Sequence, residues 1–119
     1  MELNQHRVLI VEDEIFIAIE LETVLRDAGA EVVGPAMSAP EALRLIEKHT
    51  VTAAILDVRL GNHDSLPVAR RLHKAGIPFV FHTGKHSDRL ANNWPSAPIV
   101  KKPALTGTLI ATLIAAVKK

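Results

Sequence analysis

Polar residues of several chemical kinds follow four short apolar runs in this chain. Glu12 and Asp13 follow the first run, Asp57 ends the second, and Thr83 and Lys102 follow the third and the fourth. Carboxylates, a hydroxyl and an amine can together bind a divalent cation, offer an oxygen to an electrophile and neutralise an incoming anion. This combination suits the uptake of a phosphoryl group, because phosphoryl transfer depends mainly on positioning and charge stabilisation.

The elements that must position these residues alternate between short β-branched runs and longer helical stretches. Such alternation predicts parallel strands joined by crossover helices. The carboxyl ends of parallel strands meet at one edge of a sheet, where ligand chemistry gathers. The expected strands are residues 7–11, 31–35, 53–57, 78–82 and 97–100. The expected helices are residues 14–28, 39–48 and 65–75, followed by a last helix after Pro103.

The expected fold class is α/β, a (βα)5 flavodoxin-like, doubly wound parallel sheet with strand order 2-1-3-4-5. The fourth helix is expected to be reduced, because residues 86–94 are few and include two consecutive asparagines. Ser38 is expected to cap the second helix, with Glu41 as its capping-box partner. A chain of 119 residues can bury one core but not two, so residues 1–119 are expected to form one domain.

Composition excludes several kinds of site. The chain has no cysteine, which excludes disulfides, thiolate catalysis and zinc–sulfur sites. The six histidines have no metal-ligand spacing and are expected to be surface or core residues. A net charge of +1, with no long run of one sign, argues against a nucleic-acid partner. The chain has neither a signal segment nor an apolar run of membrane-spanning length, so a cytoplasmic protein without membrane contact is expected.

The acidic residues need positive charge close to them, because crowded carboxylates repel one another. Mg²⁺ suits this role, since it is a hard cation that takes oxygen ligands and pairs with phosphate oxygens. Lys102 adds a point charge that can pair with Asp57, or with a phosphoryl oxygen when one is bound. Thr83 supplies a hydroxyl donor, and Gly84 leaves its backbone N–H open to an anion.

With these motifs in this order, the chain resembles the receiver domains of bacterial two-component response regulators. The resemblance extends from Val8 to about Val117. It implies that Asp57 is the phospho-acceptor, Thr83 the switch hydroxyl and Lys102 the amine that pairs with the phosphoryl group. The family's phosphoryl donor is a phosphohistidine on a sensor histidine kinase or a histidine phosphotransfer protein.

The resemblance also implies a Mg²⁺ site with Asp13 as a direct ligand. Its protein groups would be Glu12, Asp13, Asp57 and the backbone carbonyl of Arg59. The family's lysine immediately precedes a proline, which selects Lys102 over Lys101, and the bond from Lys102 to Pro103 is expected to be cis as in the family.

The chain departs from the family pattern near the expected switch. Ile99 stands where the family usually has Tyr or Phe, and Ala104 stands where Phe is common. The loop at residues 58–64 lacks the common Pro-Gly turn, and the stretch from Thr83 to Lys102 is short. With Ile99 in place of the aromatic residue, we expect coupling to come from Thr83 drawing in its own loop.

The expected function is that of a phospho-accepting receiver that signals to a downstream protein target by a change in protein–protein contacts. It would assist its own phosphotransfer and dephosphorylation and would not otherwise be an enzyme. The sequence ends with the last helix, so a stand-alone receiver is expected. A homodimer through the strand at residues 97–100 and the last helix is a further expectation, because that helix is apolar nearly all round.

Four alternatives compete with this interpretation. An aspartyl-phosphate hydrolase of the haloacid dehalogenase type needs a second acid two residues after its nucleophile, where Arg59 stands. A flavodoxin-like FMN binder would be repelled by the acids at residues 12–14. The intact acidic set argues against a degenerate receiver that acts only as a binding module. A receiver fragment of a larger regulator or hybrid kinase stays open.

Overall fold

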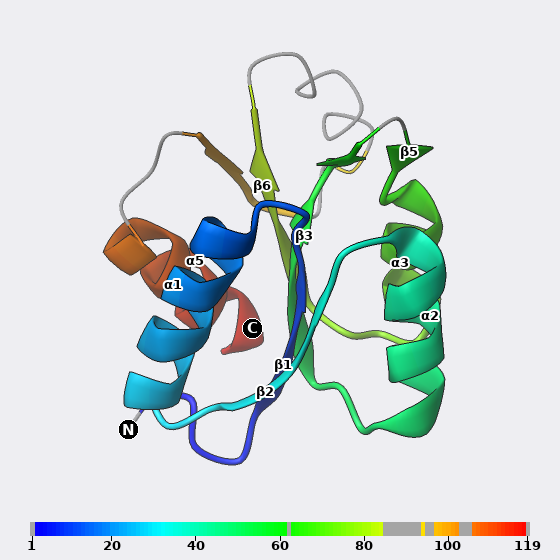
Figure 1. Cartoon of the computed structure of the whole chain (residues 1–119). Helices are drawn as coiled ribbons and strands as arrows, with labels where there is room; N and C mark the ends of the chain where they lie inside the picture. Colours follow the sequence, from blue (N-terminus) through cyan, green and yellow to red (C-terminus); the bar gives the residue numbers. More distant parts are fainter. Residues whose placement is uncertain (1, 62, 85–93, 95–96, 103–105, 119) are drawn as a thin grey trace.

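A five-stranded parallel sheet forms the centre of the molecule (Figure 1). The computed structural model describes residues 2–61, 63–84, 94, 97–102 and 106–118. The strand order is β2-β1-β3-β6-β7, which confirms the expected order 2-1-3-4-5. The strands are β1 (Arg7–Val11), β2 (Glu31–Ala36), β3 (Ala53–Asp57), β6 (Phe79–Thr83) and β7 (Ile99–Lys101).

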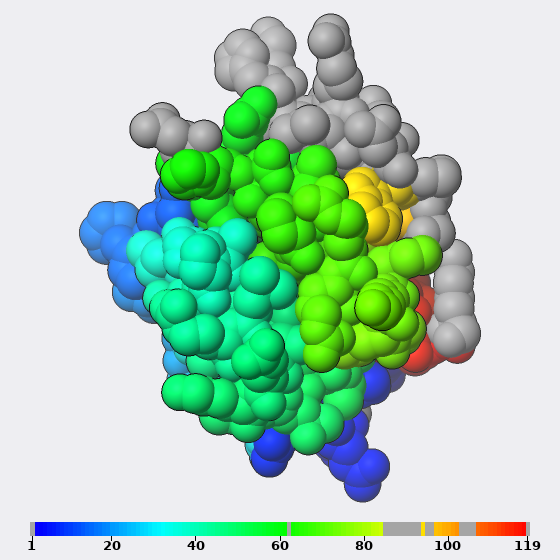
Figure 2. Space-filling model, turned by 90° about the vertical axis from the view of Figure 1, so that its right-hand side faces the viewer, coloured from blue at the N-terminus to red at the C-terminus, as the bar shows by residue number. Residues whose placement is uncertain are grey.

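Helices cover both faces of this sheet, as a doubly wound fold requires. They are α1 (Ile15–Asp27), α2 (Ala39–Lys48), α3 (Leu66–Lys74) and α5 (Thr106–Val117). Helices α1 and α5 pack on one face, and α2 and α3 pack on the other (Figure 1). Figure 2 shows α2 and α3, in cyan to green, side by side over their face. The strands alternate between the two layers: Leu9 and Val11 face α2 and α3, whereas Val8 and Ile10 face α1 and α5.

Local signals in the sequence predicted the helix ends well. The hydroxyl oxygen of Ser38 accepts a bond from the backbone N–H of Glu41 at 3.3 Å, as expected of an N-cap. The Glu41 carboxylate completes the cap by accepting from the N–H of Met37, one residue before the expected partner. Helix α1 ends just before Gly29, whose φ of +95° is a backbone conformation that glycine adopts easily.

The loop after Asp57 forms a small hairpin that the sequence did not predict. Strands β4 (Arg59–Leu60) and β5 (His63–Asp64) pair antiparallel. Between them, Gly61 has a φ of +65°, which suits a tight turn. The described residues of this loop are therefore held in pairs directly after Asp57.

Two expected features, the reduced fourth helix and the cis bond before Pro103, lie mostly outside the described residues. The reduced fourth helix was expected within residues 86–94, of which only Trp94 is described. Trp94 packs against the α2–α3 core cluster, with its ring 6.0 Å from that of Phe79. The expected cis bond involves Pro103, which is also outside the described part.

Helix α5 is less exposed than its apolar sequence suggested. Leu109, Ile110 and Leu113 are buried, and Ile114 and Val117 are half-buried. Within the described residues, the exposed large hydrophobic side chains lie on α1 and at Met37. The described part of α5 thus offers no large exposed hydrophobic side chain to a second copy. None of the described helices is long and apolar enough to cross a bilayer.

Candidate functional site

The candidate site lies where the strands end, on the α1–α5 side of the sheet. Residues two positions apart along a strand point to the same face. Ile10, Ile55, Val80 and Val100 all belong to the core cluster between the sheet and these two helices. The same alternation, continued past each of them, brings four polar residues to one edge. They are Glu12, Asp57, His82 and Lys102.

Lys102 is the centre of this cluster. Its ammonium lies 3.0 Å from Oδ2 of Asp57 and 3.2 Å from Oε1 of Glu12. It also lies 3.5 Å from Oε2 of Glu12 and 3.9 Å from the carboxylate of Glu14. One cation therefore holds acids that come from the ends of two adjacent strands. The backbone N–H of Lys102 donates to the carbonyl of Thr83 at 2.8 Å, which ties the loop after β7 to β6.

The β4–β5 hairpin holds the other side of the acidic cluster. The backbone N–H of Gly61 donates to Oδ2 of Asp13 at 2.9 Å. The backbone N–H of Arg59 donates to Oδ1 of Asp57 at 3.3 Å. The hairpin thus contacts both the Asp57 carboxylate and that of Asp13. The Arg59 side chain itself is exposed to solvent.

The donor set fits a hard divalent cation. Glu12, Asp13 and Asp57 each offer a carboxylate oxygen, and these oxygens lie within 4.8 Å of one another. Oε1 of Glu12 is buried and has no hydrogen bond from the described residues. An all-oxygen site with several negative charges is what Mg²⁺ prefers. The acidic triad can therefore hold a metal ion.

The electrostatics of the cluster also favour a bound cation. Burial, followed by the hydrogen bond and charge of Asp57, raises the pKa of the Glu12 carboxyl to about 8, although Lys102 acts in the opposite direction. Burial lowers the pKa of Lys102, but the hydrogen bond and charge of Asp57, with those of Glu12, outweigh it, so the pKa is raised. Lys102 is thus held as an ammonium, yet its single positive charge does not balance the negative charges that Glu12 and Asp57 carry when both are ionised.

Thr83 lies at the end of β6 and is fully buried. Its hydroxyl donates to the backbone carbonyl of Gly84 at 3.2 Å. In this arrangement the hydroxyl is engaged locally, so its expected bond to a phosphoryl oxygen stays a prediction. The same is true of the Arg59 carbonyl as a metal ligand.

The sequence interpretation missed two contributors to the site. His82 was expected to be a surface or core residue, and it is buried with Nδ1 3.9 Å from Oε1 of Glu12. Its place two residues after Val80 could have revealed that it faces the site. The bond from Gly61 to Asp13 could not have been found in this way, because it depends on how the hairpin folds.

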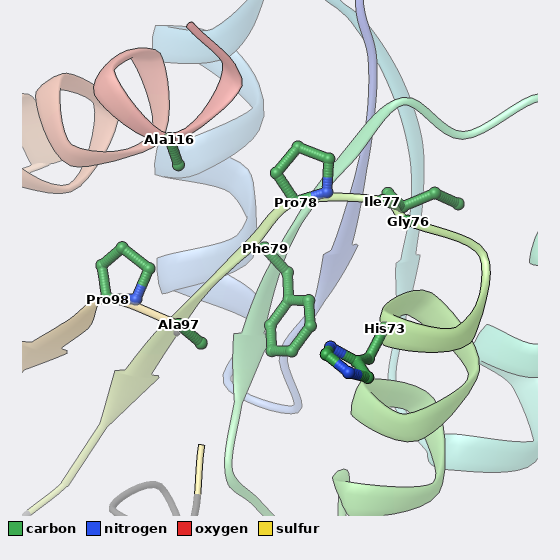
Figure 3. Close-up of a pocket in the computed structure, with 8 residues that line it drawn as sticks. All are labelled: His73, Gly76, Ile77, Pro78, Phe79, Ala97, Pro98 and Ala116. Atoms are coloured by element: carbon green, nitrogen blue, oxygen red, sulfur yellow. The ribbon is translucent and has the colours of Figure 1, made fainter. Parts of the chain in front are cut away.

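Two cavities in the described part of the chain have walls that do not include Glu12, Asp13 or Asp57. A shallow cavity of about 350 Å³ opens where β6 and β7 begin, with Phe79, Pro98 and Ala116 among its walls (Figure 3). Another, of about 480 Å³, lies between the starts of α2 and α3 and the hairpin, beside Leu60 and His63. The candidate site is defined here by its charges at the sheet edge.

Comparison with known proteins gives the family. Residues 8–112 match the response regulator receiver domain. The solved structure of SdrG from Sphingomonas melonis Fr1 is 37% identical with a TM-score of 0.84, covering 100% of this chain and 99% of that one. PhyR from Brucella abortus is 30% identical with a TM-score of 0.82, covering 98% of this chain and 50% of that one.

A curated relative matches over a shorter region. The transcriptional regulatory protein PdtaR of Mycobacterium tuberculosis is 39% identical over 66 residues, or 56% of this chain and 32% of that protein. This chain spans about a third of the length of the curated relatives it matches. The family match, the sheet order and the cluster of Glu12, Asp13 and Asp57 agree with one another. The chain belongs to the response regulator receiver domain family of two-component signalling.

Proposed function

We propose that the chain takes up a phosphoryl group on Asp57 from a phosphohistidine of a sensor histidine kinase or a histidine phosphotransfer protein. The observation that carries this proposal is the Lys102 ammonium, 3.0 Å from Asp57 and 3.2 Å from Glu12 within an acidic cluster. Such an arrangement keeps a nucleophilic carboxylate beside a cation that can accept an anionic group. We also propose that residues 1–119 act as one receiver unit.

In the reaction, a carboxylate oxygen of Asp57 forms a bond to phosphorus. The phosphorus–nitrogen bond of the donor breaks, and its electron pair returns to the donor imidazole. Lys102 turns from Asp57 to a phosphoryl oxygen, and the Thr83 hydroxyl donates to another. Each of these movements replaces a contact that the structure shows with a contact to the phosphoryl group.

Mg²⁺ would be held by Glu12, Asp13, Asp57 and the backbone carbonyl of Arg59. The ion supplies positive charge that keeps the acids ionised and offsets the charge of the phosphoryl oxygens. The backbone N–H of Gly61 donates to Oδ2 of Asp13, which is one of the proposed metal ligands. Metal binding would therefore break or shift this hydrogen bond. The hairpin would then respond to the state of the site.

The donor would approach over the start of α1. Ile15 and Phe16 follow directly after Glu14, whose carboxylate contacts Lys102, and Ile19 lies one turn on. The side chains of these three residues are exposed, Phe16 to 84%. An apolar surface at the rim of the site can be covered by a partner protein while its phosphohistidine reaches Asp57.

The output is proposed to be a change in contacts with a downstream protein target. Thr83 would transmit it by drawing in its loop, since Ile99 stands in place of the aromatic switch. A homodimer through β7 and α5 has less support, because the large hydrophobic side chains in the described part of α5 are buried or half-buried.

The alternatives fare differently against the structure. A haloacid dehalogenase-type hydrolase is disfavoured, because the position two after Asp57 holds the exposed Arg59 and not an acid. The alternative of a fragment of a larger regulator stays open, because the chain matches relatives of two lengths. It covers 99% of the SdrG chain and 50% of the PhyR chain. Receivers like this one therefore occur in short and in longer chains.

The test is phosphorylation by acetyl phosphate with and without Mg²⁺, followed by intact mass measurement. We expect wild-type protein to gain the mass of one phosphoryl group only with Mg²⁺, and Asp57→Asn to gain none. Asp27→Asn is the matched control, because Asp27 is an exposed aspartate at the end of α1. Labelling that survives Asp57→Asn, or that proceeds fully in chelator, would refute the assignment.

A further inference from the structure

His82 and Glu12 form a pair of buried polar groups that face each other without a hydrogen bond. Nδ1 of His82 lies 3.9 Å from Oε1 of Glu12, and both side chains are almost fully buried. Among the described residues, neither ring nitrogen of His82 has a hydrogen-bond partner, and Oε1 of Glu12 has none either. Buried polar groups are usually paired, so two unpaired groups aimed at each other call for an explanation.

The position of His82 places it inside the site. On β6 it is in register with Asp57 of β3, and it follows Val80 on the face that looks toward α1 and α5. An aliphatic side chain would fill this position without the free-energy penalty of burying an unpaired imidazole. The polar side chain is therefore explained better by the groups around it than by packing.

Glu12 needs a donor that Lys102 does not fully provide. The ammonium lies 3.2 Å from Oε1, but its hydrogen bonds go to Oε2 and to Asp57. When Lys102 turns to a phosphoryl oxygen, as proposed above, Oε1 loses this neighbour as well. The imidazole of His82, 3.9 Å away, then lies beside Oε1 with an N–H to offer.

His82 can supply this hydrogen bond in its neutral form. A neutral imidazole carries one N–H and one lone pair. Only the N–H can bond to an ionised carboxylate, so the Nδ1–H form fits the observed geometry.

We propose that His82 is a positioning residue that donates its Nδ1–H to Oε1 of Glu12 and so orients this acid for the bound divalent cation. The inference rests on the proposed function, because it assumes the Mg²⁺ site at Glu12, Asp13 and Asp57. A shift of less than about 1 Å brings the two atoms within hydrogen-bond distance. Partners of metal ligands that act in this way commonly change metal affinity by 10- to 100-fold when removed.

Two substitutions separate the hydrogen bond from the filling of space. His82→Leu removes every polar atom and keeps an apolar side chain, whereas His82→Asn keeps an N–H donor on the atom bonded to Cγ, where Nδ1 stands in histidine. Isothermal titration calorimetry with Mg²⁺ should show binding weaker by about 10-fold or more in His82→Leu. In His82→Asn the affinity should return to within about threefold of wild type.

A measurement without metal shows whether the variants fold. In chelator, His82→Leu should melt at the wild-type temperature or above it, because it removes an unpaired buried polar group. The combination of unchanged or higher Tm with weaker Mg²⁺ binding is what a positioning role predicts. Equal Mg²⁺ affinity in wild type and His82→Leu would overturn the inference, as would equally weak binding in both variants.

Nitrogen-15 NMR of wild-type protein gives a test that needs no variant. In the Mg²⁺-loaded protein, the His82 ring should be the Nδ1–H tautomer, with a slowly exchanging ring proton. The Nε2–H tautomer would overturn the inference. Failure of the proposed function is recognised separately, because wild-type protein would then bind no Mg²⁺ and Asp57→Asn would change nothing.

Discussion

The ammonium of Lys102 lies 3.0 Å from Oδ2 of Asp57, although the two residues are 45 positions apart in the sequence. The contact joins the loop after β7 to the end of β3, across the intervening strand β6. It places the positive charge of the site directly on the proposed acceptor. The same ammonium contacts Glu12, so one cation lies beside both acids.

Removing Lys102 should weaken the metal-free fold and increase its response to Mg²⁺. In Lys102→Met, the carboxylates of Asp57 and Glu12 lose their shared cation, and the free energy of unfolding should fall by about 1–3 kcal/mol in chelator. Mg²⁺ should recover more stability in the variant than in wild type, because Lys102 no longer competes for the acids. Urea unfolding with and without Mg²⁺ measures both effects.

Lys74→Met is the control for this prediction, because Lys74 is an exposed lysine in the last turn of α3. It should unfold close to wild type under both conditions. A Lys102→Met protein that unfolds at the wild-type urea concentration in chelator would show that the ammonium does not stabilise the acids.

The metal-free protein should lose stability as the pH rises from 6.5 to 8. The folded-state pKa of Glu12 is raised from 4.5 to about 8, so the folded state binds more protons than the unfolded state between these values. The free energy of unfolding then falls as the pH rises through this window. The pKa of His82 is lowered from 6.5 to about 4, which acts in the opposite sense but only below pH 6.5.

Urea unfolding at several pH values from 6.5 to 8, in chelator, measures this slope. Glu12→Gln should flatten it, because the amide does not titrate, and saturating Mg²⁺ should flatten it by keeping Glu12 ionised. A wild-type slope of zero would contradict the raised pKa of Glu12, and a slope that Glu12→Gln leaves unchanged would assign the pH dependence to another group.

The exposed start of α1 should matter to a protein donor and not to a small one. Phe16→Ala removes an 84% exposed side chain, so it should leave the fold intact. Burying a Phe ring at an interface contributes about 1.5–3 kcal/mol to the free energy of binding. In Phe16→Ala, kcat/KM for transfer from a phosphorylated histidine phosphotransfer protein should therefore fall by roughly 10- to 100-fold. The rate with acetyl phosphate should not change.

Glu20→Ala is the matched control, since Glu20 is another exposed residue of α1. Autoradiography of transfer from a labelled donor measures the protein reaction. Equal slowing by Phe16→Ala with both donors would mean that the ring acts on the site itself and not on docking.

Two glycines should differ in how much they tolerate a side chain. A Cβ at Gly34 would lie 2.8 Å from the backbone nitrogen of Ala36 and 3.0 Å from the carbonyl of Ile10, and its φ is +98°. Gly76 has a φ of +72° with open space around it. Gly34→Ala should therefore destabilise by about 2–5 kcal/mol, from strain and overpacking, and Gly76→Ala by about 1–2 kcal/mol. Urea unfolding compares them, and equal losses would contradict the clash at Gly34.

Local and periodic features of this protein could be predicted from its sequence. The strand order followed from the βα alternation, and the Ser38 cap followed from a pattern within four residues. The acids at the strand ends were identified because parallel strands bring their carboxyl ends together. These features depend on chain connectivity and on side-chain alternation, which the sequence contains directly.

The contacts within the site were decided by the tertiary structure. The pairing of Lys102 with both Asp57 and Glu12 and the approach of His82 to Glu12 depend on the register of β1, β3, β6 and β7. The two-residue alternation of a strand indicates which face of the sheet a residue occupies. It does not indicate which residues of the neighbouring strands lie opposite it. The hairpin that brings Gly61 to Asp13 likewise depends on a turn that no local pattern predicted. Register and turn geometry are set by packing of the whole sheet between its helices, and they appear only when the chain is folded.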